Sequence, residues 1–298
     1  MAITIKSKKI TSKQNNTRQT ISAIGEPRDR RLEVNGLKLH YLEWGPKDRP
    51  TMLLLHGFLG HGHVWDDFAR VFSLNYHILA LDQRGHGRSA WVKEGAYGLE
   101  DHFSDLSGFI ELLDLDSIIL VGHSMGGRNA LFFTACLPDK VNRLVVVDSR
   151  PAASHGSIMA LKSWLAGEGP GPGSFDTLVN GISSAYPRLT RQTCRRIIAH
   201  GYKKASDRKF TPRYDLQMRQ DVVESGFVVE DLRPYLAGIS CPVLVIRGAN
   251  SPVLSASAAQ EMCRLMPEAE LEEIPSASHL PVQENPSAFN RAVKAFLE

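Results

Sequence analysis

The stretch from Ser117 to Gly127 (SIILVGHSMGG) constrains the fold most, because it predicts a strand, a sharp turn and a helix in that order. Residues 118–121 are apolar and mostly β-branched, as in a buried strand, and residues 128–137 suit a helix. Ser124 lies at the apex of the turn. A serine there must adopt a strained backbone conformation, and glycines two residues before and after it remove Cβ atoms that would clash. We therefore expect an exposed hydroxyl, with the amides that start the helix directed at whatever the oxygen attacks.

Composition bounds the class of protein. The chain has 298 residues, 43% of them hydrophobic and 22% charged, which suits one large α/β domain with an insertion or two ordinary domains. A net charge of +3 is too small to predict nucleic-acid binding, and no apolar run reaches the roughly 20 residues of a membrane span. The four cysteines are widely spaced, without a C-x-x-C pair. They favour a reduced, cytoplasmic protein over a disulfide framework or zinc site, and no cofactor or metal is predicted.

The N-terminal segment differs from the rest of the chain. Residues 1–25 contain five basic residues and no acidic one, with many Ser, Thr, Asn and Gln. We predict a flexible extension over residues 1–30, because this composition buries too little apolar surface to fold alone. A transit peptide to an organelle is the alternative, but the segment has little arginine and no clear amphipathic helix.

Strand and helix patterns alternate after this segment. Residues 31–44 alternate apolar and polar side chains around Asn35-Gly36, which predicts a hairpin with a type I′ turn. Strands are predicted over 51–55, 76–81, 141–147, 241–246 and 270–274, and helices over 64–72, 99–113, 257–266 and 286–297.

Three loops follow predicted strands and carry polar residues. The glycines of 56–60 (HGFLG) would let a backbone amide approach a ligand closely, as an oxyanion donor must. Residues 82–89 (DQRGHGRS) lack a Walker lysine or dinucleotide spacing, so we expect a structural loop held by an Asp82–Arg84 pair, with His86 a loop residue and not a base. Asp148 follows a strand at the sheet edge where open α/β proteins bind ligands.

Residues 150–236 interrupt the alternation and predict a helical cap inserted into a core of residues 31–149 and 237–298. From Arg188 to Arg219 the cap has ten basic residues and two acidic ones. Most of these must form a solvated helix face, but their sum favours an anionic substrate.

A serine nucleophile needs a base, usually a histidine that a carboxylate orients. Of eleven histidines, His279 alone lies in a late loop between a terminal strand and a final helix, whereas His123 lies within the turn and faces away from the serine's partner position. The order serine, acid, histidine is the one found on this type of sheet.

The ordered motifs HGFLG (56–60), DQRGHGRS (82–89), GHSMG (122–126), RGANS (247–251) and SHLP (278–281) resemble those of the α/β-hydrolase fold superfamily from about residue 31 onward. The resemblance implies a mostly parallel central sheet with helices on both faces. It also implies that Ser124 is the nucleophile, that His279 is the general base, and that the backbone amides of Phe58 and Met125 form the oxyanion hole.

The acid departs from the common family pattern. The usual position, three residues after Gly248, holds Ser251, whose hydroxyl cannot supply the charge that stabilises imidazolium. Some members of the fold take the acid from the end of the strand after the nucleophile helix, where Asp148 stands. We therefore predict a triad of Ser124, Asp148 and His279. Members with this arrangement include esterases and hydrolases of small carboxylated amides.

The resulting hypothesis is a hydrolase of a small acyl ester or amide, including carboxylate-bearing ones, with a small-molecule substrate as its partner. Serine at the elbow argues against haloalkane dehalogenase or epoxide hydrolase chemistry, which uses aspartate there. Two alternatives stay open: hydrolysis of a carbon–carbon bond in a vinylogous diketone, and a non-catalytic ligand receptor of the same fold. The sequence does not define the oligomeric state.

Overall fold

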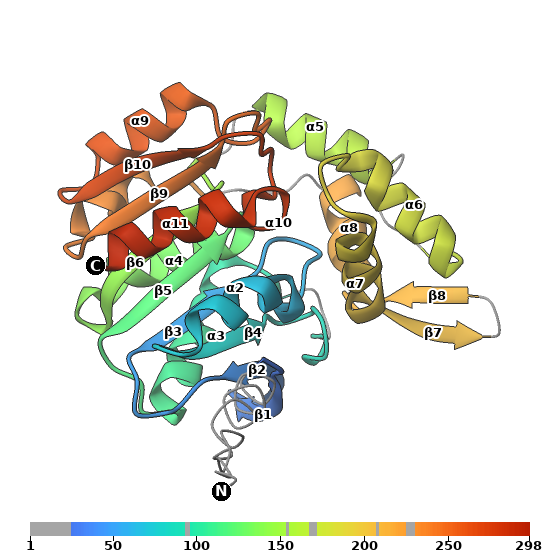
Figure 1. The fold of residues 1–298 in the computed structure, drawn as a ribbon, viewed down its shortest axis with the longest axis horizontal. Helices are drawn as coiled ribbons and strands as arrows, with labels where there is room; N and C mark the ends of the chain where they lie inside the picture. Colours follow the sequence, from blue (N-terminus) through green and yellow to red (C-terminus); the bar gives the residue numbers. More distant parts are fainter. Residues whose placement is uncertain (1–24, 93–95, 153–154, 167–171, 207–208, 225–229) are drawn as a thin grey trace, which may run out of the picture.

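An eight-stranded sheet forms the centre of the molecule (Figure 1). The structure is a computed structural model that describes residues 25–92, 96–152, 155–166, 172–206, 209–224 and 230–298. Most of the predicted N-terminal extension therefore lies outside the described residues. The strands are β1 (Arg28–Val34), β2 (Leu37–Trp44), β3 (Thr51–Leu55), β4 (His77–Asp82), β5 (Ile118–His123), β6 (Val141–Val147), β9 (Val243–Gly248) and β10 (Ala269–Ile274).

The strand order is β1-β2-β4-β3-β5-β6-β9-β10. Strand β2 is antiparallel to both of its neighbours, and all other pairs are parallel. The predicted α/β class with a mostly parallel sheet is confirmed. Because parallel strands end at the same edge, the carboxyl ends of β3, β4, β5, β6 and β9 gather the loops that the sequence singled out.

The first hairpin has its predicted turn but begins earlier than expected. Asn35 and Gly36 have φ values of 52° and 78°, the two positive angles of a type I′ turn. Residues 28–30, which we assigned to the extension, belong to β1, where Arg28 pairs with Glu43. Their run of charges hid the strand, but Arg28 and Arg30 both donate hydrogen bonds to the Glu43 carboxylate.

Helices cover both faces of the sheet. One apolar core includes side chains of α3 (Leu99–Leu112), α4 (Met125–Cys136) and α9 (Ala256–Arg264), and the other includes α2 (Asp66–Phe72) and α11 (Pro286–Leu297). Strand β3 serves both, since Leu53 and Leu55 lie in the first core and Met52 and Leu54 in the second. Burying each such side chain contributes about 1.5–3 kcal/mol, which explains the continuous apolar strands. Short helices η1 (Gly62–Trp65), η2 (Pro138–Lys140) and α10 (Pro281–Glu284) complete the covering layers.

The chain between the adjacent strands β6 and β9 includes residues 150–236, the segment predicted to form a cap, and we use the name cap for this segment. Most of its elements lie together on one side of the sheet (Figure 1), whereas the last, η3 (Arg233–Gly238), packs through Leu236 against the core beside α4. The elements of the cap are α5 (His155–Ala166), α6 (Phe175–Ala185), α7 (Arg191–Gly201), β7 (Tyr202–Ser206), β8 (Lys209–Pro212), α8 (Leu216–Glu224) and η3 (Arg233–Gly238). The antiparallel hairpin of β7 and β8 differs from the expected all-helical cap. Its exposed, lysine-rich first strand lacks the apolar alternation that marks strands in sequence.

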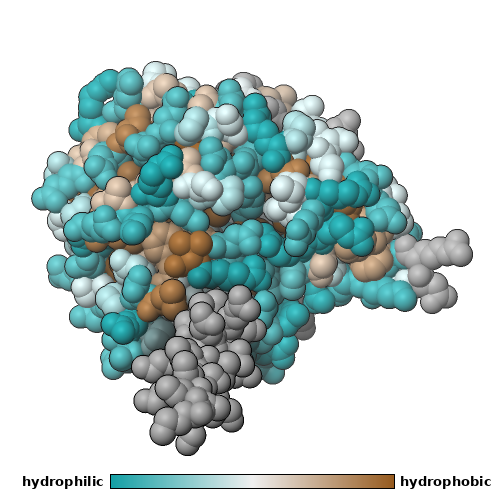
Figure 2. All heavy atoms as spheres, viewed as in Figure 1, coloured by the Kyte–Doolittle hydropathy of each residue, from teal (hydrophilic) through white to brown (hydrophobic). Residues whose placement is uncertain are grey.

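The outer surface in the view of Figure 2 is mainly hydrophilic, with hydrophobic residues in small, separated groups. Among the described residues, no helix combines the length and apolar character needed to cross a membrane.

Candidate active site

Ser124 occupies a strained turn between β5 and α4. Its φ is 52° and its ψ is −114°, a conformation that costs a non-glycine residue about 1–3 kcal/mol. The surroundings compensate, because the Ser124 amide donates to the carbonyl of Val147 (2.9 Å) and the Ser149 hydroxyl donates to the carbonyl of Ser124 (2.7 Å). A Cβ on Gly122 would come within 2.2 Å of a backbone oxygen. The strand, turn and helix therefore approach too closely for any residue but glycine at that position.

His279 contacts the other two predicted triad residues. Its Nε2 lies 3.0 Å from Ser124 Oγ, and its Nδ1 lies 2.7 Å from Asp148 Oδ2. The carboxylate accepts the Nδ1 proton, so the Nε2 lone pair faces the serine hydroxyl. The His279 side chain is 19% exposed, whereas the Asp148 side chain is completely buried. This geometry suits proton transfer from Ser124 to His279, with a buried charge behind the imidazole.

Asp148 is held by more than the histidine. Its φ is 45°, and its Oδ1 accepts the Gly248 amide at 3.0 Å. Its Oδ2 also accepts the hydroxyl of Ser251 at 2.6 Å. Ser251 is thus a hydrogen-bond partner of the predicted acid, a contact that sequence reasoning missed. The hydroxyl proton is directed to Asp148 because Ser251 Oγ itself accepts the amides of Val253 and Leu254.

The predicted oxyanion loop lies against the elbow. A Cβ on Gly57 would come within 2.8 Å of His123 Nδ1 and 3.1 Å of Ser124 Cβ, so the loop that carries Phe58 directly follows a point of close contact with the elbow. Met125 is the first residue of α4, where backbone amides have no partner within the helix. The candidate oxyanion amides, those of Phe58 and Met125, each follow directly on one of two residues in close contact, Gly57 and Ser124.

Two buried histidines shape this loop. His56 Nε2 accepts the Gln83 amide at 3.0 Å, and His86 Nε2 accepts the Leu59 amide at 3.2 Å. Burial lowers the pKa of His56 to about 3 and that of His86 to about 4. Both rings therefore stay neutral near pH 7, which leaves Nε2 free to accept. These contacts agree with a structural role for His86.

His123 supports the loop that carries His279. Its Nε2 lies 2.7 Å from the backbone carbonyl of His279, and burial lowers its pKa to about 3. The neutral ring donates this hydrogen bond. His123 therefore positions the backbone of His279, a role that the sequence did not indicate.

The predicted Asp82–Arg84 pair is wrong. Asp82 lies opposite His40 in the β2–β4 register, and its Oδ2 accepts the His40 Nδ1 proton at 2.7 Å. Arg84 turns the other way and forms a two-pronged ion pair with Asp105 of α3, at 2.7 and 2.8 Å. The strand register and the helix behind the loop decide these partners, and neither is local in sequence.

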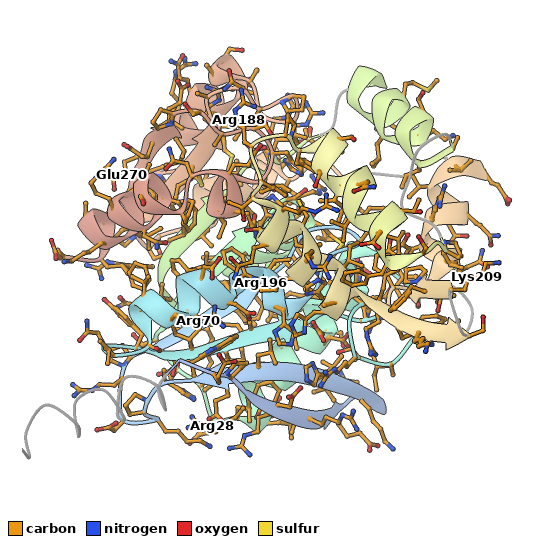
Figure 3. The ribbon with its side chains drawn as sticks, turned by 45° about the vertical axis from the view of Figure 1, so that its right-hand side comes forward. Arg28, Arg70, Arg188, Arg196, Lys209 and Glu270 are labelled. Carbon is orange, nitrogen blue, oxygen red and sulfur yellow. The ribbon has the colours of Figure 1, made fainter. Side chains whose placement is uncertain are left out.

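The basic residues of the cap separate into different surroundings. Arg213 and Lys203 line a cavity of about 340 Å³ with two cationic side chains of the core, Arg31 and Arg88. Gly87, Ser89 and Trp91 complete the lining. By contrast, Figure 3 shows Lys209 at the outer end of the hairpin, away from the core. We call the cavity lined by Arg31, Arg88, Lys203 and Arg213 the cationic pocket.

The cationic pocket lies at the carboxyl end of β4, two strands from β5, and contains no residue of the predicted triad. Arg88 donates to Asp29 at 2.5 Å, which offsets part of the positive charge. Arg195 lies elsewhere, 3.5 Å from Asp176 and over the ring of Phe175.

A family model for the alpha/beta hydrolase fold matches residues 50–286. The chain belongs to this family. It is 27% identical over 269 residues to 2-(acetamidomethylene)succinate hydrolase of Mesorhizobium japonicum, covering 90% of this chain and 95% of the relative. It is 26% identical over 285 residues to 3-oxoadipate enol-lactonase 2 of Acinetobacter baylyi, covering 90% and 96%. A crystal structure of E-2-(acetamidomethylene)succinate hydrolase superposes with a TM-score of 0.82 at 27% identity, covering 91% of this chain and 99% of that one.

Proposed function

We propose that this α/β hydrolase is a serine hydrolase that cleaves a small acyl ester or amide through an acyl-enzyme intermediate. The observation that supports this most is His279, which contacts Ser124 Oγ at 3.0 Å and Asp148 Oδ2 at 2.7 Å at once. Nucleophile, base and orienting acid are thus within reach of one another without any rearrangement.

The mechanism follows from this geometry. Ser124 Oγ attacks the substrate carbonyl carbon while His279 Nε2 takes the hydroxyl proton. The amides of Phe58 and Met125 stabilise the negative oxygen, and the charge of Asp148 stabilises the imidazolium. His279 then gives its proton to the leaving oxygen or nitrogen, which leaves Ser124 acylated. Water repeats the cycle, with its proton taken by His279, and releases the acid and the free serine.

A fluorophosphonate probe tests the nucleophile. We expect stoichiometric labelling of the wild-type protein and none of Ser124→Ala, together with turnover of p-nitrophenyl esters. An unlabelled Ser124 in a folded protein would contradict the proposal and favour the ligand-receptor alternative. Ester, amide and vinylogous diketone substrates tested side by side separate acyl hydrolysis from carbon–carbon bond hydrolysis.

We further propose that the substrate carries a carboxylate. The names of two relatives denote carboxylate-bearing substrates, a succinate and an oxoadipate derivative. The cationic pocket supports this idea, because four cationic side chains around one cavity attract anions and raise their local concentration.

Arg213 and Arg195 form a matched pair for this test, since both are cap arginines and only Arg213 lines the cationic pocket. We expect Arg213→Gln to lower kcat/KM for an anionic ester about threefold to fivefold relative to a neutral ester of the same length, as for one partly exposed charge contact. Arg195→Gln should leave that ratio unchanged. An unaltered ratio in Arg213→Gln would remove the anionic preference while leaving the hydrolase assignment intact.

A further inference from the structure

Three histidines and an aspartate meet where the core touches the cap. His61 is the N-cap of η1, and His63 lies within η1. Asp66 is the first residue of α2, and His200 lies near the end of α7. The His63 and His200 rings stack with centroids 3.6 Å apart, and the His61 centroid lies 6.2 Å from that of His63 and 6.3 Å from that of His200. None of these residues belongs to the predicted triad.

Two ring nitrogens of this group are buried without a hydrogen-bond partner in the described part of the chain: His61 Nδ1 and His63 Nε2. His61 is 3% exposed and uses its Nε2 proton to reach the Ile197 carbonyl at 3.1 Å, so its Nδ1 carries a lone pair. Buried polar atoms are normally paired, and each exception needs an explanation. Both unpaired nitrogens belong to imidazoles, and imidazole lone pairs are good ligands for metals.

The ligand atoms are already close together. One atom each from His63, Asp66 and His200 lie within 4.8 Å of one another, a spacing that the described residues show for no other group of His, Cys, Asp and Glu. His63 Nδ1 and Asp66 Oδ1 are 3.1 Å apart. Two ligands that each lie about 2.0–2.2 Å from one tetrahedral zinc ion have a similar separation. His200 would turn its ring out of the stack with His63 to present a nitrogen to the same ion.

We propose that His63, Asp66 and His200 bind a divalent transition metal ion of the zinc type, with His61 beside them. Two imidazoles and one carboxylate match Zn²⁺, Ni²⁺ or Cu²⁺, whereas Mg²⁺ and Ca²⁺ prefer sites made of oxygen ligands.

The ion would link the cap to the core, because His200 comes from α7 and the other ligands from η1 and α2. The same helices are joined by a second contact, the Arg196–Asp67 ion pair. His61 also follows directly on the HGFLG loop that carries Phe58. Metal binding would therefore hold the cap in place next to the candidate active site.

The experiment uses the untagged, full-length protein after chelator treatment and dialysis, with Zn²⁺ followed by calorimetry and Co²⁺ followed by visible absorption. We expect saturable binding of one ion per chain and a visible absorption spectrum typical of bound Co²⁺ with a low coordination number. Tm should rise by several degrees with Zn²⁺ but not with Mg²⁺. His200→Gln should weaken Zn²⁺ binding at least about tenfold, because losing an outer-shell partner of a ligand already costs about that much and here a ligand itself is lost.

Arg196→Gln is the matched control, because it removes the neighbouring ion pair between the same helices and keeps every ligand. It should bind Zn²⁺ as the wild type does. Absence of saturable Zn²⁺ binding, or equal binding by wild type and a His200→Gln variant that circular dichroism shows to be folded, would overturn the proposal. His200 is only partly buried, so this variant decides the question even if His63→Gln does not fold.

Discussion

Replacing Asp148 by Asn should abolish most of the activity without changing the shape of the site. The new amide nitrogen, placed at Oδ2, would donate to His279 Nδ1, which lies 2.7 Å away. That forces the ring proton onto Nε2, where it faces Ser124 Oγ and blocks proton transfer. The same exchange in a serine protease costs about 10⁴ in kcat, or about 5 kcal/mol of barrier, and we expect a loss of this order here.

Ser251→Ala is the comparison that makes this prediction sharp. The variant loses one hydrogen bond to Asp148 Oδ2, but the carboxylate keeps its contacts with His279 and the Gly248 amide. We expect kcat/KM to fall by less than about tenfold, or about 1.4 kcal/mol. Stability should fall by about 1–2 kcal/mol, because the amides of Val253 and Leu254 lose their acceptor.

A double variant tests which position supplies the charge. Because Ser251 Oγ lies 2.6 Å from Asp148 Oδ2, a carboxylate at residue 251 can approach His279 Nδ1. Asp148→Asn combined with Ser251→Asp should therefore recover part of the activity that Asp148→Asn loses. The assay is steady-state hydrolysis of p-nitrophenyl acetate, with urea unfolding of each variant as the control. A loss of kcat smaller than tenfold in Asp148→Asn, or an equal loss in Ser251→Ala, would refute the assignment of Asp148.

Two further predictions concern the oxyanion loop and acid stability. Gly57→Ala places a methyl group within 2.8 Å of His123 Nδ1 and 3.1 Å of Ser124 Cβ, so we expect kcat to fall by at least about tenfold and fluorophosphonate labelling to slow in parallel. Burial alone would raise the pKa of Glu43, but hydrogen bonds from Arg30 and His77 lower it to about 2. The folded state therefore gains up to about 3 kcal/mol from this carboxylate above pH 4.5 and loses it as the pH falls toward 2. The free energy of unfolding of the wild type, measured in urea, should fall as the pH falls through this window. That of Glu43→Gln should depend less on pH if this sign is right.

Local sequence patterns determined much of the architecture. The Asn35-Gly36 turn, the continuous apolar strands such as 51–55 and the elbow at Ser124 each depend on φ angles or on alternation within a few residues. Physical constraints of this range are visible in one stretch of chain. The family resemblance joined these stretches in order and pointed to His279 and Asp148 as partners of the serine.

The tertiary structure decided which polar groups meet. Asp82 pairs with His40 because the β2–β4 register places them opposite each other, and Ser251 contacts Asp148 because β9 lies beside β6. Hydrogen bonds of this kind join residues far apart in the chain, so spacing within the sequence carries no signal for them.

The same reason explains the cap and its contacts with the core. The hairpin of β7 and β8 is stabilised by its pairing and not by an apolar alternation, and His63 meets His200 only because α7 folds back over η1. Sequence alone therefore determined most strands of the central sheet, the first hairpin turn and the strained serine, since each follows from local sterics and apolar burial. The partners of the buried charges, the cationic pocket and the histidine cluster required the tertiary structure, since they depend on how distant elements pack.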